Sequence, residues 1–465
     1  MTSQVISRSI LFGELIRSKT AICGMIILAA LIIMTLYAVL GIPLESFRQW
    51  NNPSFWIDYP KGAAPAWTNL GIFGPTKAEH IILTKDDASI SEDLFNGVRI
   101  VTYSYHIDFN HDSYPSDFMI SYSVKYHSIP PVLQIDIVRP DRQKFMIYNT
   151  PLPPSMQDDK NVNEFTSRVF STDSSVREYL QTYKHLFKYD QDTSTPQIML
   201  FSDSVNKQVL KGTYVINERF YLFNQGDSVE EAGLILGGKV YGLMGTDELR
   251  RDLAIGILWG APVALFIGLT VSVASILIGL IYGILAGYKG KRTDEALMRV
   301  NDLFYSLPAL PLLVILSIVI GRSIFLITAF LVIFGWVGTA KIARSLALQI
   351  KNLQYVEAAK LMGESDIKIL YKHVIPQLLP LTFASIAIAV PGAILGEAAL
   401  SFLGLGDPSI PTWGQILHEA NSAAAAARGL WWWIIPPGFM IALTGMGFAL
   451  LGSAVDYIIN PRRRG

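Results

Sequence analysis

The chain has 465 residues, of which 51% are hydrophobic and only 16% are charged, against about a quarter in an average soluble protein. Lys and Arg together number 38, as do Asp and Glu, so the net charge gives no reason to expect a nucleic-acid partner. The only cysteine, Cys23, excludes an internal disulfide. It lies in an apolar run, where we expect a small apolar side chain rather than a reactive thiol.

Long uncharged runs predict a membrane protein with six spans. A bilayer core needs about 20 apolar residues as helix, and Thr20–Gly41 supplies the first. The run Leu253–Tyr288 is too long for one span and too short for two. We therefore expect a short interfacial helix ending near Trp259, a break at Pro262 and a span from about Ala261. Four further spans are predicted: Leu303–Gly321, Ser323–Ala340, Leu379–Gly396 and Leu430–Val455.

The distribution of Lys and Arg predicts the orientation of the spans. Sixteen of these residues lie in the two tails and in the loops after the second and fourth spans, whereas the opposite short loops carry only Arg322 and Arg428. Positive charge marks the cytoplasmic side. Both termini are therefore predicted to be cytoplasmic, and the long segment between the first two spans to lie outside the cell.

That inserted segment, residues 44–240, is predicted to be a mixed, β-rich domain. Alternating apolar residues indicate half-buried strands, and a turn is expected at 139–142. A helix is expected at Ser174–Lys188. The strands are predicted at Met119–Tyr126, Val132–Val138, Phe145–Tyr148 and Thr213–Phe223. The histidines are scattered, and we predict no metal site and no catalytic residues.

One cytoplasmic segment combines residues in an unusual way. Glu357, Ala358 and Ala359 favour a helix, and Gly363 can take the left-handed conformation that ends it. Ser365 is expected to cap a second short helix, with Asp366 in its first turn. The pattern predicts a helix–Gly–helix projection, a shape that a second protein can grip.

This segment resembles the EAA loop of ABC importer permeases, with His373-Val374-Ile375-Pro376 closest to the peptide/nickel subgroup. The resemblance implies that the loop, about residues 341–378, docks on an ATPase subunit. Its implied coupling residues are Tyr355, Glu357, Ala358, Ala359, Gly363, Asp366, His373 and Pro376.

Other segments resemble the same family in the same order. They are Gly245–Asp252, Ala286–Gly290, Asp294–Arg299, Leu400–Gly406 and Pro411–Gly414. The chain departs from the family at two places. Arg250 stands where Gly is usual, and the first outer loop is far longer than usual.

An ionisable residue within a span is a candidate functional site, because it is costly in lipid. Glu397 lies near the outer end of the fifth span. With Ser401 and Phe402 it is a candidate for the pathway or outer gate. The alternative is that Glu397 pairs with a backbone group or a partner subunit at the water boundary.

The expected fold is an all-α polytopic membrane protein with six transmembrane helices, the type I ABC importer permease fold. The expected parts are residues 1–43 (N-tail and first helix), 44–240 (β-rich extracytoplasmic insert) and 241–465 (permease core with five helices). The chain has no phosphate-binding Gly-x4-Gly-Lys-Ser/Thr loop. It is therefore expected to be a transport subunit rather than an enzyme, and to bind no cofactor of its own.

The resemblance implies a prokaryotic cytoplasmic-membrane importer that takes di- or oligopeptides. Its implied partners are a second homologous permease subunit, two ABC ATPase subunits that use ATP and Mg²⁺, an extracytoplasmic solute-binding protein and membrane lipid. Import of oligosaccharides or nickel by the same machinery is one alternative. The others are a membrane-anchored receptor or enzyme with an active outer domain, and a channel, which would not need the docking loop.

Overall fold

The computed structural model divides into two compact units. The membrane unit comprises residues 1–52 and 254–465, and the insert unit comprises residues 53–253. The expected basic residues Arg8 and Arg462–Arg464 lie outside the described part of the chain. The residues described are 17–70, 74–127, 129–153, 163–188 and 195–459.

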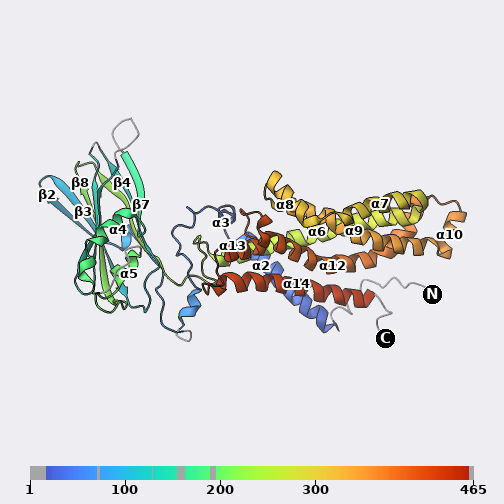
Figure 1. The fold of residues 1–465 in the computed structure, drawn as a ribbon, viewed down its shortest axis with the longest axis horizontal. Coiled ribbons are helices and arrows are strands. Elements are labelled where there is room, and N and C mark those ends of the chain that lie inside the picture. Colours follow the sequence, from blue (N-terminus) through green and yellow to red (C-terminus); the bar gives the residue numbers. More distant parts are fainter. Residues whose placement is uncertain (1–16, 71–73, 128, 154–162, 189–194, 460–465) are drawn as a thin grey trace. The chain divides into compact units, whose positions relative to one another are not determined.

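The membrane unit is helical (Figure 1). Within the described residues, five helices are long and apolar enough to cross a membrane, namely α2, α6, α9, α12 and α14. The bent pair α7 and α8 gives a sixth span if it is counted as one. The helices are α2 Lys19–Gly41, α3 Leu44–Arg48, α6 Leu253–Lys289, α7 Lys291–Ser306, α8 Ala309–Val319, α9 Ile324–Lys351, α10 Gln354–Leu361, α11 Asp366–Ile369, α12 Ile375–Leu400, α13 Trp413–Ser422 and α14 Trp431–Ile459.

The predicted break near Pro262 is wrong, because α6 runs unbroken through 37 residues with Pro262 inside it. A proline inside a helix removes one backbone hydrogen bond. The helix nevertheless continues through Pro262, and a distant residue packs closely against the preceding turns. The indole N–H of Trp413 donates to the carbonyl of Ile257 over 2.9 Å, and a Cβ on Gly260 would lie only 2.3 Å from that indole nitrogen. This contact from a distant segment is not visible in the local sequence.

The predicted third span, Leu303–Gly321, contains a bend that the sequence prediction did not include. The chain bends by 75° between α7 and α8. Leu307 has the extended conformation, with φ −71° and ψ 134°, as expected of a residue that precedes a proline. Pro308 then stands at the start of α8.

The insert unit contains two antiparallel sheets that share one core of buried side chains from both (Figure 1). One sheet has the strand order β1-β9-β4-β7, and the other β2-β3-β8-β5-β6. The strands are β1 Ile81–Thr84, β2 Ser89–Phe95, β3 Val98–Phe109, β4 Phe118–Tyr126, β5 Val132–Val138, β6 Lys144–Pro151, β7 Asn163–Phe170, β8 Gly212–Leu222 and β9 Ser228–Leu236. Two short helices, α4 Ser174–Gln181 and α5 Pro196–Phe201, accompany them.

The β-rich prediction is confirmed, and the four predicted strands correspond to β4, β5, β6 and β8. The predicted turn joins β5 to β6, where the N–H of Arg142 donates to the carbonyl of Arg139 over 2.9 Å. The predicted helix Ser174–Lys188 is too long. It ends at Gln181, and a separate 3-10 turn follows at Lys184–Leu186.

The segment Gly245–Asp252 forms a tight joint within the insert unit. Asp247 accepts hydrogen bonds from the N–H groups of Leu249 and Arg251 and pairs with the buried Arg251 guanidinium at 2.6 Å. Arg250 takes the left-handed conformation, with φ +67°. The bend that glycine usually provides in the family is therefore present with arginine in its place.

A single carboxyl group, Glu218 of β8, lies in the core between the sheets with no exposed surface. It is opposite Tyr103 on one side and Ile135 on the other. In the described part of the chain, neither its carboxyl oxygens nor the nearby Tyr105 hydroxyl has a hydrogen-bond partner. Burial raises the pKa of Glu218 well above its usual value.

We predict that Glu218 destabilises the insert unit increasingly as pH rises. The folded state keeps a proton that the unfolded state loses above about pH 4.3, so stability falls as pH rises through the raised pKa. Glu218→Met should raise stability by about 1–3 kcal/mol at neutral pH and by less at pH 5. Hydrogen exchange of the β8 amides would measure this, with the exposed Glu231→Met as control. Equal gains at both pH values would contradict the prediction.

Candidate functional site

The EAA loop, residues 341–378, forms the predicted helix–Gly–helix unit. After α10, Gly363 has φ +83°. Its N–H donates to the carbonyl of Lys360, and the N–H of Glu364 donates to that of Ala359. These two bonds form the Schellman arrangement that ends a helix. The predicted side-chain cap by Ser365 is wrong: Ser365 occupies the N-cap position of α11, but its hydroxyl makes no capping bond.

Beyond the glycine turn, the carboxylate of Glu364 contacts the basic residues Lys368 and His373. Glu364 lies 3.1 Å from Lys368 and 3.2 Å from the Nε2 atom of His373. The hydrogen bond from Lys368, followed by that from His373, lowers the pKa of Glu364. His373 itself lies in a π-helical turn, Leu370–Val374, that leads into α12. The loop is thus closed on itself by charge-assisted hydrogen bonds.

Large apolar side chains cover the outer surface of the loop, and sequence reasoning missed them. Each of the four is at least 77% exposed. They are Leu361, Met362, Ile367 and Tyr371. An exposed apolar patch next to charged groups is typical of a protein-interaction surface. In the sequence, the available sign that these side chains form an interaction surface was their position beside the predicted glycine turn.

The other predicted loop residues are divided between the loop's surface and its base. Glu357 and Ala358 are exposed, whereas Ala359 is buried against α6 and α9. Tyr355 accepts a hydrogen bond from Gln377, and its ring lies 6.0 Å from that of His373 at an angle of 55°. Pro376 is the second residue of α12 and directly follows the π-helical turn Leu370–Val374.

Three glycines let α6 approach α9 closely on the same side as the loop. Gly279, Gly283 and Gly287 recur every fourth residue, the small-residue spacing that brings membrane helices together. A Cβ on Gly283 would lie 2.2 Å from the carbonyl oxygen of Ala340, and one on Gly287 would lie 2.6 Å from that of Arg344. The backbones of α6 and α9 are therefore in contact along this strip.

A cavity of about 430 Å³ lies among α6, α9 and α12. All of its lining side chains are uncharged. Its polar groups are hydroxyls from all three helices: Ser272, Ser275, Thr339, Thr382 and Ser385. The sequence prediction did not include these residues, although Ser272 and Ser275, like Thr382 and Ser385, have the spacing that places two side chains on one helix face.

Glu397 is 4% exposed and belongs to a buried polar cluster. The Ser401 hydroxyl donates to its Oε1 atom over 2.6 Å, and the Thr412 side chain also hydrogen bonds to it. Here α12 passes into a π-helical turn, Ser401–Leu405, and α13 begins after Thr412. The residues that line the cavity end at Ala393 on α12. A pathway role for Glu397 and Ser401 therefore stays a prediction.

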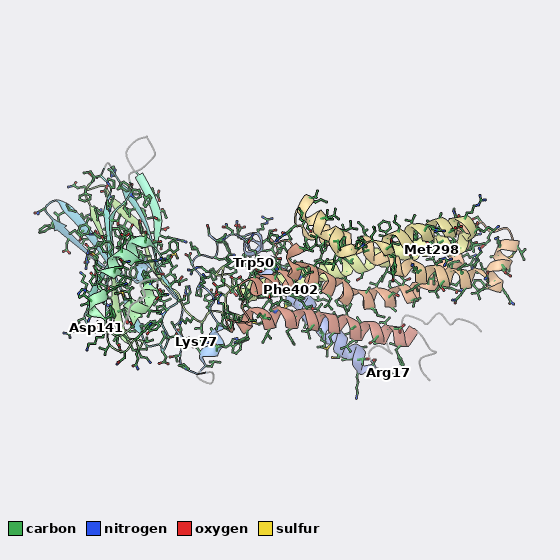
Figure 2. The ribbon with its side chains drawn as sticks, viewed as in Figure 1. Arg17, Trp50, Lys77, Asp141, Met298 and Phe402 are labelled. Carbon is green, nitrogen blue, oxygen red and sulfur yellow. The ribbon has the colours of Figure 1, made fainter. Side chains whose placement is uncertain are left out.

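The two candidate regions lie at opposite ends of the membrane unit. Figure 2 shows Phe402 at the end that also carries Trp50, whereas Met298 of α7 lies toward the end with α10. Phe402 is 43% exposed, unlike the buried Glu397. The cavity lies between these ends along α12, since its lining includes residues from Leu378 to Ala393.

Comparisons with known proteins assign a family to this architecture. The family model "Binding-protein-dependent transport system inner membrane component" matches residues 279–465. The oligopeptide transport system permease protein OppC of Bacillus subtilis (strain 168) is 35% identical over 221 residues, 47% of this chain and 72% of that protein. The dipeptide transport system permease protein DppC of the same organism is 37% identical over 221 residues, 47% and 68% of the two chains. A structure of the inward-facing MetNI methionine ABC transporter aligns with a TM-score of 0.36 and 18% identity, over 43% of this chain and 93% of that one.

We predict that the glycine strip sets the stability of the membrane unit. Gly283→Ala places a methyl group against the Ala340 carbonyl, so the helices must separate, at a cost of about 1–3 kcal/mol. Thermal unfolding in detergent should show a lower midpoint. Gly338→Ala on α9 is the matched control, because a Cβ there meets nothing within 4 Å. Equal midpoints for the two variants would contradict the prediction.

Proposed function

This chain belongs to the family of binding-protein-dependent transport system inner membrane components, and on that premise we propose that it forms half of the translocation pathway of a peptide importer. Its family members are permease components of ABC importers and not enzymes. Such a permease works with ATPase subunits and with an external binding protein. We propose in addition a second homologous permease and two ATPases that use ATP and Mg²⁺.

The observation that carries the proposed substrate is the uncharged, hydroxyl-bearing lining of the cavity. Hydroxyl groups can donate to and accept from the amide groups that all peptides share. The described lining has no imidazole, thiolate or carboxylate, the ligands that a nickel ion needs. The relatives named for oligopeptide and dipeptide transport support the same substrate class. Oligosaccharides are the remaining alternative.

The EAA loop is the proposed contact with the ATPase. Its exposed apolar patch, Leu361, Met362, Ile367 and Tyr371, would enter a groove of that partner. The excess of Lys and Arg in the tails and in the loops after the second and fourth spans supports a cytoplasmic location for the loop and both termini. ATP binding would close the ATPases, move the loop and open the pathway outward.

We predict that the backbone conformation at Gly363 is required for coupling. Valine is strained at φ +83°, whereas asparagine tolerates it. Within the described part of this chain, a Cβ there would meet no atom within 4 Å, so Gly363→Val strains the backbone without a clash inside the chain. Gly363→Val should lower binding-protein-stimulated ATP hydrolysis in the purified complex, and Gly363→Asn should largely retain it. Normal stimulation in Gly363→Val would reject this role.

The same complex tests the partner and its side of the membrane. On a Cys23→Ser background, a cysteine replacing the exposed Met362 should crosslink to the ATPase, which is cytoplasmic. A cysteine replacing the exposed Leu94 of β2 should not. Crosslinking from Leu94 alone would overturn the proposed orientation. Peptides recovered from the associated binding protein would identify the substrate, and a bound sugar or metal ion would reject it.

For the extracytoplasmic insert, expected at residues 44–240, we propose a docking role toward the binding protein. The β2–β3 hairpin supports this. Every residue of the edge strand β2 is exposed, and Leu94 and Phe95 at its tip are 77% and 66% exposed. Binding of a protein partner would bury the apolar side chains at this tip, and removing apolar surface from water is favourable. The alternative is that the insert only stabilises the outer face.

We predict that Leu94→Ser with Phe95→Ser weakens stimulation by the loaded binding protein by about tenfold or more, as expected for an apolar anchor. Basal ATP hydrolysis should not change. Ile82→Ser is the control, since Ile82 is an exposed apolar residue of the other sheet. Replacing residues 53–253 by a flexible linker should leave an assembled complex with little response. Full response after deletion would reject docking, and failed assembly would favour stabilisation.

A further inference from the structure

A tyrosine side chain of α6 forms a hydrogen bond with the second helix of the EAA loop. The loop is covalently continuous with α9 before it and with α12 after it, but not with α6. The hydroxyl of Tyr288, at the end of α6, donates to the Oδ1 atom of Asp366 over 3.0 Å. Asp366 is the first residue of α11. This hydrogen bond therefore joins α6 directly to the loop.

Tyr288 is itself held in place by its neighbours. Its side chain is 5% exposed and packs in an apolar cluster with Ala347 of α9 and Val356 of α10. The ammonium group of Lys351 donates to the backbone carbonyl of Tyr288 over 2.7 Å and lies 5.7 Å from the centre of its ring. These contacts hold the Tyr288 ring in the position from which its hydroxyl reaches Asp366.

The two loop helices have different attachments. Only Asn352 and Leu353 separate α10 from α9, so α10 follows α9. In contrast, α11 lies beyond the Gly363 turn, continues through the π-helical turn Leu370–Val374 into α12, and packs through the buried Ile369 in the cluster that contains Tyr288. The backbones of α6 and α9 are in contact at Gly283 and Gly287. A hydrogen bond from α6 to α11 therefore links α11 to the same pair of helices that α10 follows.

We propose that Tyr288 is the positioning residue that makes the EAA loop and the α6–α9 pair move as one body. The inference rests on the proposed coupling function of the loop. Its consequence reaches the cavity, because Ser272 and Ser275 of α6 form part of the cavity wall. A displacement of α11 is transmitted through Asp366 and Tyr288 to α6, and so to that wall. Without the hydrogen bond, the polar link between α11 and α6 is lost, and less of a displacement of α11 reaches Ser272 and Ser275.

The test measures the cavity directly and needs no knowledge of the solute. In the complete transporter, purified through a tag on this chain and carrying Cys23→Ser, Ser275→Cys reports the cavity by its rate of reaction with a maleimide. The rate is compared without nucleotide and with ATP and vanadate. We expect a nucleotide-dependent change in this parent complex. We expect Tyr288→Phe to reduce the change clearly while ATPase subunits remain bound and basal ATP hydrolysis continues.

Two control variants separate positioning from general structure. Tyr282→Phe removes another α6 hydroxyl, which donates to the Leu297 carbonyl over 2.7 Å and not to the loop, and it should retain the change. Asp366→Asn keeps an acceptor oxygen and should also retain it. Retention of the change in Tyr288→Phe would overturn the proposal, as would its loss in Tyr282→Phe or dissociation of the ATPase from Tyr288→Phe.

The outcome also distinguishes this inference from its premise. If Gly363→Val reduces the change and Tyr288→Phe does not, the loop couples but Tyr288 does not position it. If nucleotide leaves the cysteine's reactivity unchanged in the parent complex, the proposed coupling function fails, and this inference fails with it.

Discussion

The close approach of α6 to α9 is the constraint on which the rest of the membrane unit depends. Glycine at every fourth position brings a carbonyl of α9 to within 2.2–2.6 Å of where α6 side chains would begin. Hydrophobic burial supplies little driving force between helices in lipid, so such backbone contact is a main source of helix association. The pairing fixes one wall of the cavity. It also brings Tyr288 of α6 and Val356 of α10 into one core.

The polar cluster around Glu397 imposes a second constraint, at the opposite end of α12. A carboxyl group that is 96% shielded needs hydrogen-bond partners, and Ser401, one helical turn later, provides one. The helix then breaks at Gly404, whose φ is +82°, and this break allows the chain to return through Thr412. The carboxyl group therefore joins α12 to the segment that starts α13. A structural role of this kind and a gating role are compatible, because a gate needs a defined hinge.

How far the sequence could predict the structure depended on the range of the interactions involved. Val132–Val138 was predicted with its correct ends, because strand alternation is a local property. The left-handed backbone conformation of Gly363 in the EAA loop could likewise be predicted locally, because glycine adopts a positive φ more readily than other residues. By contrast, the packing of α6 just before Pro262 involves Trp413, which is 151 positions away in the chain. The cavity likewise requires three separate helices, and no single segment contains its pattern.

Arg250 shows how distant contacts can stabilise an unfavourable backbone conformation. A left-handed conformation is unfavourable for arginine by roughly 1–2 kcal/mol. Here the Arg250 guanidinium donates to the carbonyl of Tyr59 over 2.7 Å and pairs with Asp117. Both partners belong to the insert unit. Charge-assisted hydrogen bonds of this kind contribute about 1.5–3 kcal/mol each, enough to offset the strain. The strain at Arg250 is therefore offset by side-chain and backbone partners far from it in the chain, at Tyr59 and Asp117.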